Sequence, residues 1–287
     1  KATLNTILLA KDNDYTDIEL IDIGGVIDFS GAEVNYFEPL QKVTDAKGRA
    51  NYDDKSFNLD IYSARLDDVT LNKATIKITD LDKVDENTNA LIDIDVDLQG
   101  SLGTALRVID SKPLKYPTQL GIKAEDFSGN NVMKLKLQFP LHQKLEVDEV
   151  KVEVKANVKN LVAKNVVEDF SLSSDNIAVF VDNKHISIKG KGTLDNMPID
   201  FTWRNNFSDK INEDSRLEAK ITLNSESLLR FGVPSDLNIK GAVPAVIEHI
   251  VDRNKTSKLK LESDLSNTSL ELPFVNYKKP ETVVGRV

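Results

Sequence analysis

The chain has 287 residues and a formal net charge of −9; 40% of its residues are hydrophobic, 29% are charged, 6% are aromatic and none is Cys. The acidic balance opposes nucleic-acid binding, because phosphate recognition needs clustered Lys and Arg. The lack of Cys excludes disulfides, thiol catalysis and thiolate metal sites. No run approaches the roughly 20 apolar residues of a transmembrane helix, so we expect any membrane anchor to lie outside this chain.

Alternating apolar and polar residues dominate the sequence, and this period of two is typical of strands with one apolar face and one solvated face. Short polar turns separate many of these segments, which favours antiparallel hairpins over crossover helices. We expect roughly twenty strands. The clearest segments are residues 57–63, 74–81, 91–100, 134–141, 150–158, 185–194, 198–204, 216–225, 236–241 and 257–265.

Residues 101–111 form the best helix candidate, because Ser101 can cap the helix and Pro113 stops it. This helix is expected either to cap or plug an apolar trough, or to connect strands while packing on the sheet; both alternatives turn its apolar stripe inward. The stripe consists of Leu102, Ala105, Leu106 and Ile109.

Two later segments are less clear. Residues 225–234 predict one short helical turn that ends at Gly232 and Pro234. Residues 244–254 fit a helical stripe as well as a strand, and we predict a strand because the following turn and the next strand indicate a hairpin.

A weak internal repeat relates two segments that both begin with glycine. Residues 48–61 align without a gap to residues 190–203, and each predicts a strand, a two-residue polar turn and a second strand. Recurring supersecondary units of this kind build stacked, elongated sheets.

Three aspartates in residues 93–97 resemble the start of a calcium loop. That loop needs Gly at its sixth position and Glu at its twelfth, where this chain has Leu98 and Thr104. We therefore predict a solvated strand face. The aspartates are Asp93, Asp95 and Asp97.

Other candidate sites are equally weak. The histidines His142, His185 and His249 are far apart and have no second ligand at metal spacing, so we interpret them as hydrogen-bonded surface or edge residues. Residues 189–193, KGKGT, lack the spacing of a phosphate loop. We predict no enzyme, no cofactor and no metal site.

The central question is what covers the apolar strand faces. In residues 150–158, VKVEVKANV, each Val kept from water is worth ~1.5 kcal/mol or more. A dry sandwich commonly fills such a core with aromatic side chains, which are scarce here, so a trough that holds lipid acyl chains is the alternative we favour. The candidate lining residues are Val150, Val152, Val154, Val158, Leu135, Leu137, Ile186, Ile188, Phe201, Trp203, Leu217, Ile221, Leu259 and Leu261.

Four segments carry a resemblance to a known family: residues 97–116, 186–203, 226–251 and especially 257–280, SKLKLESDLSNTSLELPFVNYKKP. In that order they resemble the AsmA-like proteins of the YhdP branch. The last segment is the most specific, with Asp264 and Leu265 between two strands, and Tyr277 and Lys278 before Pro280.

The resemblance implies an all-β, elongated, rolled antiparallel sheet that forms a hydrophobic groove, a β-taco with one or two short helices. It implies phospholipid as the partner and a location in the periplasm of a Gram-negative bacterium, attached to the inner membrane. Residues 1–287 would form one continuous groove segment, which can be subdivided into 1–115 and 116–287.

Two alternatives stay open. One is a structural or outer-membrane assembly scaffold with a closed, dry sandwich or solenoid core. The other is a groove that carries lipoprotein or lipopolysaccharide instead of phospholipid.

Overall fold

The computed structural model describes residues 1–11, 18–34, 42–84, 89–110, 115–142, 144–167, 169–207, 212–231 and 233–285. These residues divide into two compact units. Unit 1 comprises Lys1–Asn157 and Val181–Asn183, and unit 2 comprises Val158–Phe180 and Lys184–Val287. The expected subdivision at residue 115 stays a prediction.

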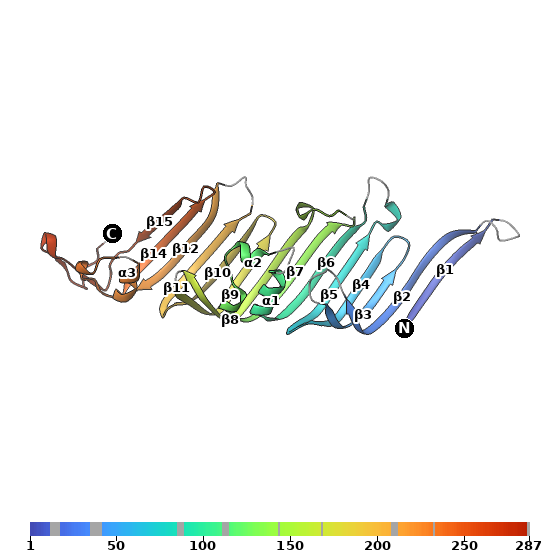
Figure 1. Ribbon diagram of the computed structural model, residues 1–287, viewed down its shortest axis with the longest axis horizontal. Coiled ribbons are helices and arrows are strands. Elements are labelled where there is room, and N and C mark those ends of the chain that lie inside the picture. The colour runs from blue at the N-terminus through green and yellow to red at the C-terminus, as the bar shows by residue number, and fades with distance from the viewer. Residues whose placement is uncertain are drawn as a thin grey trace. The chain divides into compact units, whose positions relative to one another are not determined.

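Antiparallel strands make up most of the described chain (Figure 1). The strands are β1 (Ala2–Ala10), β2 (Ile18–Val34), β3 (Val43–Tyr52), β4 (Phe57–Leu66), β5 (Val69–Thr79), β6 (Leu91–Ser101), β7 (Phe127–Pro140), β8 (Lys151–Val167), β9 (Phe170–Asp182), β10 (His185–Leu194), β11 (Met197–Asn206), β12 (Glu213–Leu223), β13 (Lys240–Gly241), β14 (Val243–Asp252), β15 (Ser257–Glu262), β16 (Thr268–Leu272) and β17 (Tyr277–Lys279).

Fourteen of the strands form one open sheet in the order β1-β2-β3-β4-β5-β6-β7-β8-β9-β10-β11-β12-β14-β15. Strands β13, β16 and β17 form a second, three-stranded sheet. Neighbours in the large sheet mostly follow one another in the chain because short turns connect them, as expected for hairpins. The predicted fold class, an all-β antiparallel sheet with short helices, is confirmed, and the sheet is open.

Helices are short. The α-helices are α1 (Leu102–Ile109), α2 (Tyr116–Gln119) and α3 (Ser225–Arg230), and the 3-10 helices are η1 (Leu81–Lys83), η2 (Ala124–Asp126), η3 (Val147–Glu149), η4 (Ser235–Leu237) and η5 (Pro273–Val275). Helix α1 begins after Ser101 as predicted, and α3 is the predicted short turn. Residues Ser111 and Pro113, where α1 was expected to end, lie outside the described residues.

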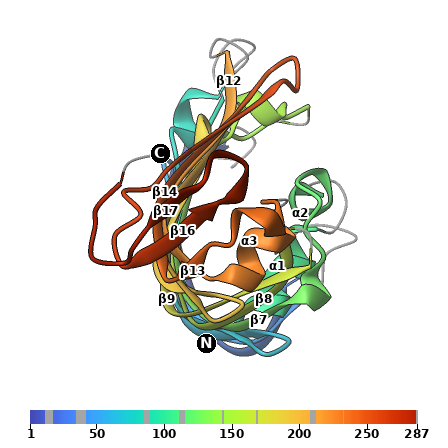
Figure 2. The ribbon, with the colours of Figure 1, turned by 90° about the vertical axis from the view of Figure 1, so that its left-hand side faces the viewer.

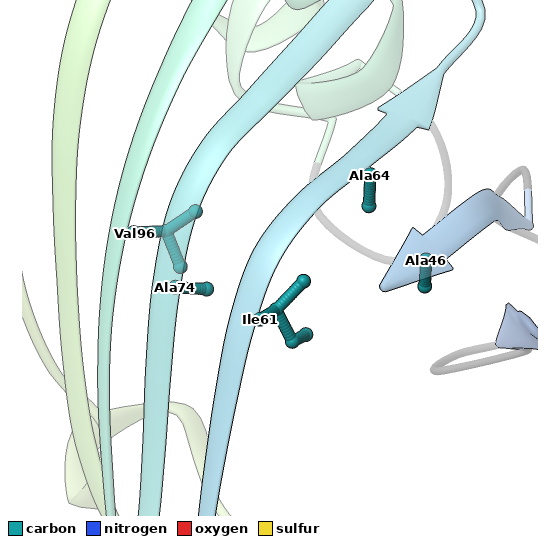
Figure 3. Close-up of a cluster of buried hydrophobic side chains, with 5 residues drawn as sticks. All are labelled: Ala46, Ile61, Ala64, Ala74 and Val96. Atoms are coloured by element: carbon teal, nitrogen blue, oxygen red, sulfur yellow. The ribbon is translucent and has the colours of Figure 1, made fainter. Parts of the chain in front are cut away.

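The core of unit 1 lies on one side of its sheet. Its buried cluster consists of small or branched side chains from β3 to β6, which point to the inner side of the bend in these strands (Figure 3). Small residues allow neighbouring strands to curve closely without overpacking. The cluster is Ala46, Ile61, Ala64, Ala74 and Val96.

The two aligned hairpins differ in their turns, which corrects the predicted repeat. In β10–β11, Leu194 pairs with Met197, and the two-residue turn has positive φ at Asp195 (44°) and Asn196 (67°), as in a type I′ turn. In β3–β4, Tyr52 pairs with Phe57, so four residues form the turn.

Two further expectations differ from the structure. The described residues contain seventeen strands rather than roughly twenty. Residues 236–241 were predicted to form a strand, but only Lys240–Gly241 do, because the chain enters η4 after Pro234 and Asn238 adopts a left-handed conformation (φ 41°). The ambiguous residues 244–254 contain most of β14, as predicted.

Candidate functional site

Strands β2–β7 of unit 1 place apolar side chains directly opposite one another. Most of these large side chains stay half-buried, because the described strands of unit 1 belong to a single sheet. One row contains Ile27, Ala50, Leu59, Ile76, Ile94 and Leu137, and the next contains Phe29, Gly48, Ile61, Ala74, Val96 and Leu135.

The opposite face of unit 1 is charged. Lys136 Nζ lies 3.5 Å from Asp95 Oδ2, Lys134 Nζ lies 3.1 Å from Asp97 Oδ1, and Gln138 Nε2 donates to Asp93 Oδ1 at 2.8 Å. The three aspartates of the rejected calcium loop thus occupy a solvated strand face, as predicted. The described residues hold no cluster of three metal-ligating side chains.

Strand β8 contributes its first residues to unit 1. Lys151 Nζ donates to Gln138 Oε1 at 3.0 Å, which places Lys151 on the polar face. Because side chains alternate along a strand, Val152 and Val154 lie on the apolar face. Val150 precedes the strand, and its carbonyl accepts a 2.6 Å hydrogen bond from Asn183.

Unit 2 repeats this two-faced construction. Its polar face holds ion pairs such as Lys191 with Asp200 (3.1 Å) and Arg216 with Glu248 (2.6 Å). Its apolar face again consists of rows that cross β10, β11, β12, β14 and β15. The first row is Ile188, Trp203, Leu217, His249 and Leu259, and the second is Gly190, Phe201, Ala219, Ile247 and Leu261.

The structure brings most of the candidate lining residues onto these two faces. Leu135, Leu137, Val152 and Val154 belong to the face of unit 1. In unit 2, Val158 is buried in β8. Ile186 and Ile221 lie in the rows that flank the two rows named above for unit 2. The remaining candidates belong to those two rows: Ile188, Phe201, Trp203, Leu217, Leu259 and Leu261. Whether any of them contacts lipid stays a prediction.

Sequence reasoning missed the contribution of β14. Ile247 and His249 lie in the rows of unit 2, and His249 Nε2 lies 2.6 Å from Ser257 Oγ. The prediction that His249 is hydrogen-bonded is confirmed, but its place in an apolar row was not foreseen. The alternation of residues 243–252 was the available signal, and a competing helical stripe obscured it.

The start of helix α1 is surrounded by polar contacts. Ser101 Oγ accepts from the Thr104 amide at 3.1 Å, and Arg107 Nη2 donates to Thr104 Oγ1 at 2.7 Å. Hydrogen bonds from Thr104 and Ser101, with the attraction of Arg107, lower the pKa of Asp68 in the β4–β5 turn. Thr104 is 2% exposed.

The apolar stripe of α1 is partly buried, so its inward orientation stays a prediction. Thr104 is the fully buried residue of the helix, whereas Leu102 and Leu106 are half-buried and Ile109 is exposed. The helix packs against β6, β7 and η2. Plug and connector both remain hypotheses for it.

Helix α3 is held by aromatic and ionic contacts. The Arg230 guanidinium lies 3.6 Å from the ring centroid of Phe170, and Phe231 stacks on the same ring at 5.0 Å. Arg230 also forms a 2.7 Å ion pair with Asp195, and this hydrogen bond is the main reason that the pKa of Asp195 is lowered. Figure 2 shows α3 on the inner side of the curved strands of unit 2.

A polar cavity of about 380 Å³ lies between α3 and the β10–β11 turn. Its lining includes Arg230, Asp195 and Glu226, together with several hydroxyl and amide side chains. Because Arg230 is already paired with Asp195, the cavity has no excess positive charge to attract an anion. It therefore fits a structural contact of α3 better than a ligand site.

Comparisons with known proteins identify a family. A sequence model of the family described as YhdP protein matches residues 15–284. No curated protein and no solved structure matches the chain. Within the described residues, none of the helices has the length and apolar character needed to cross a membrane.

Proposed function

Because the chain belongs to the YhdP family, we propose that it is a non-enzymatic segment of a lipid-transfer protein, which holds the acyl chains of phospholipids on its apolar sheet faces. The family is AsmA-like and is associated with lipid transport in the bacterial envelope. We place the segment in the periplasm, attached to the inner membrane through an anchor outside this chain. The phospholipids would pass between the inner and outer membranes.

The apolar rows are the observation that carries this proposal. Neighbouring strands lie about 4.8 Å apart, so a row across six strands extends about 24 Å. The acyl chains of one bilayer leaflet span about 15 Å, half of a hydrocarbon core of about 30 Å. A row such as that from Ile27 to Leu137 is therefore long enough to contact a whole acyl chain.

Exposure of the rows gives the driving force. Leu259 is 66% exposed and Leu261 is 44% exposed, and both lie at the β15 end of the rows in unit 2. Fully burying a side chain of this size is worth about 1.5–3 kcal/mol, so partial cover by hydrocarbon contributes on the order of 1 kcal/mol for each. Summed over several side chains, this favours an apolar occupant.

The charged opposite face supports the same function. Its lysines and aspartates keep that side of the sheet solvated, so an apolar cargo is directed to one face only. A dry sandwich would need a second sheet against the rows of unit 1, and the described residues of unit 1 contain one sheet.

Val152→Asp tests the proposal. In an open trough water can reach the new carboxylate, so the fold survives while the acyl-chain path acquires a charge that is costly to desolvate. We expect near-native thermal unfolding, loss of binding of a fluorescent phospholipid analogue, and loss of complementation in cells.

Lys155→Asp is the matched control, because it introduces the same carboxylate on the polar face beside Glu153. It should keep both folding and lipid binding. A Val152→Asp protein that fails to fold supports a dry core instead. One that folds and still binds lipid normally contradicts the proposed path at this strand.

A further inference from the structure

His249 is the one ionisable residue in the paired apolar rows of unit 2, within the part of the chain that the structure describes. It pairs with Leu217 on β12 and with Leu259 on β15, and Trp203 lies one strand further along the same row. Its side chain is half-buried. A single imidazole in an otherwise apolar row suggests that the surface becomes more polar near this row.

Polarity does change on either side of this row. Along the strands in one direction lies the wholly apolar row that contains Phe201, Ile247 and Leu261. In the other direction lies a row with several polar side chains, and beyond it the charged cluster around the β14–β15 turn. The polar row is Ile186, Asn205, Ser215, Val251 and Ser257, and the cluster contains Asp214, Arg253 and Lys255.

The row of His249 therefore lies at the boundary between the apolar rows and the polar rows of this sheet face. Trp203 shares this level, and aromatic side chains with a polar atom are typical of the boundary between hydrocarbon and head groups. A phospholipid with its acyl chains on the apolar rows and its polar end toward the β14–β15 turn would place its phosphate at this level.

The pair of His249 and Ser257 has a hydrogen-bond donor for that phosphate. His249 Nε2 and Ser257 Oγ are 2.6 Å apart, so one of the two donates to the other. A neutral imidazole has one N–H and serine has one O–H. Whichever donor makes the internal bond, the other is left over for an oxygen atom of a ligand.

We propose that His249 and Ser257 form a phosphate contact for the phospholipid held by unit 2. The acyl chains lie on the wholly apolar row of Phe201, and the leftover donor binds a phosphate oxygen of the head group at the row of His249. This inference rests on the proposed function and adds to it a determinant of ligand class: lipids with a phosphate are preferred over neutral lipids with the same chains.

Two probes with identical labelled acyl chains test the contact: a fluorescent phosphatidylglycerol and a fluorescent diacylglycerol. Because a hydrogen bond to a charged group is among the stronger ones, we expect His249→Leu to lower affinity for the phosphatidylglycerol probe about tenfold. Its affinity for the diacylglycerol probe should change by less than about twofold, since the apolar rows are intact.

His249→Gln keeps N–H donors on a polar side chain and should retain most of the phosphatidylglycerol affinity, even if the leucine variant folds poorly. His142→Leu is the control, because His142 pairs with Glu149 outside the sheet and should affect neither probe. Excess inorganic phosphate should not displace the phospholipid; displacement would assign the contact to free phosphate.

The result that overturns the inference is an equal loss of both probes in His249→Leu, or no loss of either, while the unaltered protein binds both. Failure of the unaltered protein to bind either probe would overturn the proposed function itself. The two failures are thus distinguishable in one experiment.

Discussion

Units 1 and 2 build their apolar faces in the same way but secure the helix near each face by different chemistry. In unit 1 the hydroxyl groups of Thr104 and Ser101 contact the carboxylate of Asp68 at the start of α1. In unit 2 a buried ring, Phe170, and the paired Arg230 hold α3. The apolar faces therefore depend on strand alternation, whereas each helix depends on a few specific contacts.

Phe170→Ala should have the largest effect on the attachment of α3. Phe170 is 0% exposed and contacts both Arg230 and Phe231, so its loss should cost about 3–5 kcal/mol and release α3. Hydrogen exchange should show faster exchange of the α3 amides. Ile61→Ala, in the core of unit 1, should leave those amides protected. Unchanged protection of α3 in Phe170→Ala would show that the ring does not hold the helix.

The aligned glycines Gly48 and Gly190 differ in the space around them, and the effect expected of substituting them is smaller. A Cβ at Gly48 would meet the backbone oxygen of Asp60, which cannot move cheaply, whereas a Cβ at Gly190 would first meet the flexible end of Ile177. Gly48→Ala should therefore cost about 1–3 kcal/mol and Gly190→Ala less than about 1 kcal/mol, as measured by denaturant unfolding. Equal costs would contradict the difference in local packing.

Acid should weaken the attachment of both α1 and α3 to their sheets. This effect should be smaller than that of either substitution above. Hydrogen bonds from Thr104 and Ser101 lower the pKa of Asp68, and Arg230 followed by the Ser171 amide lowers the pKa of Asp195. A lowered folded pKa gives stability that is present above the unfolded value of about 3.9 and is lost as the pH falls through the folded pKa.

Between about pH 6 and about pH 3, amide exchange in α1 and α3 should therefore accelerate a few-fold after correction for intrinsic rates. Asp68→Asn should remove this acceleration in α1 alone, and Asp195→Asn should remove it in α3 alone. Acceleration that persists in the matching variant would mean that other carboxyl groups control the attachment.

Much of the fold follows from local patterns in the sequence. The alternation of apolar and polar residues predicted most strands, and the capping residue Ser101 predicted the start of α1. Both signals depend only on residues that are neighbours in the sequence. The strand predicted for residues 236–241 was mostly wrong, because Pro234 and Asn238 redirect the chain at a point where the apolar spacing still resembles a strand.

The candidate site was less predictable, because a row depends on which residues of different strands lie opposite. Leu217 and His249 pair across β12 and β14, which are separated in the chain by α3, η4 and β13. Register between such strands depends on tertiary packing rather than on the local pattern. The role of Thr104 in holding α1 was missed for a similar reason, since its partner Asp68 lies on a different hairpin.

Mass spectrometry of lipids extracted from protein purified without detergent tests the central claim most directly. We expect diacyl glycerophospholipid bound to the unaltered protein and to Lys155→Asp, and strongly reduced in Val152→Asp. Unaltered protein that is folded, carries no lipid after gentle purification and takes up none when lipid is supplied would contradict the claim that its apolar faces hold acyl chains.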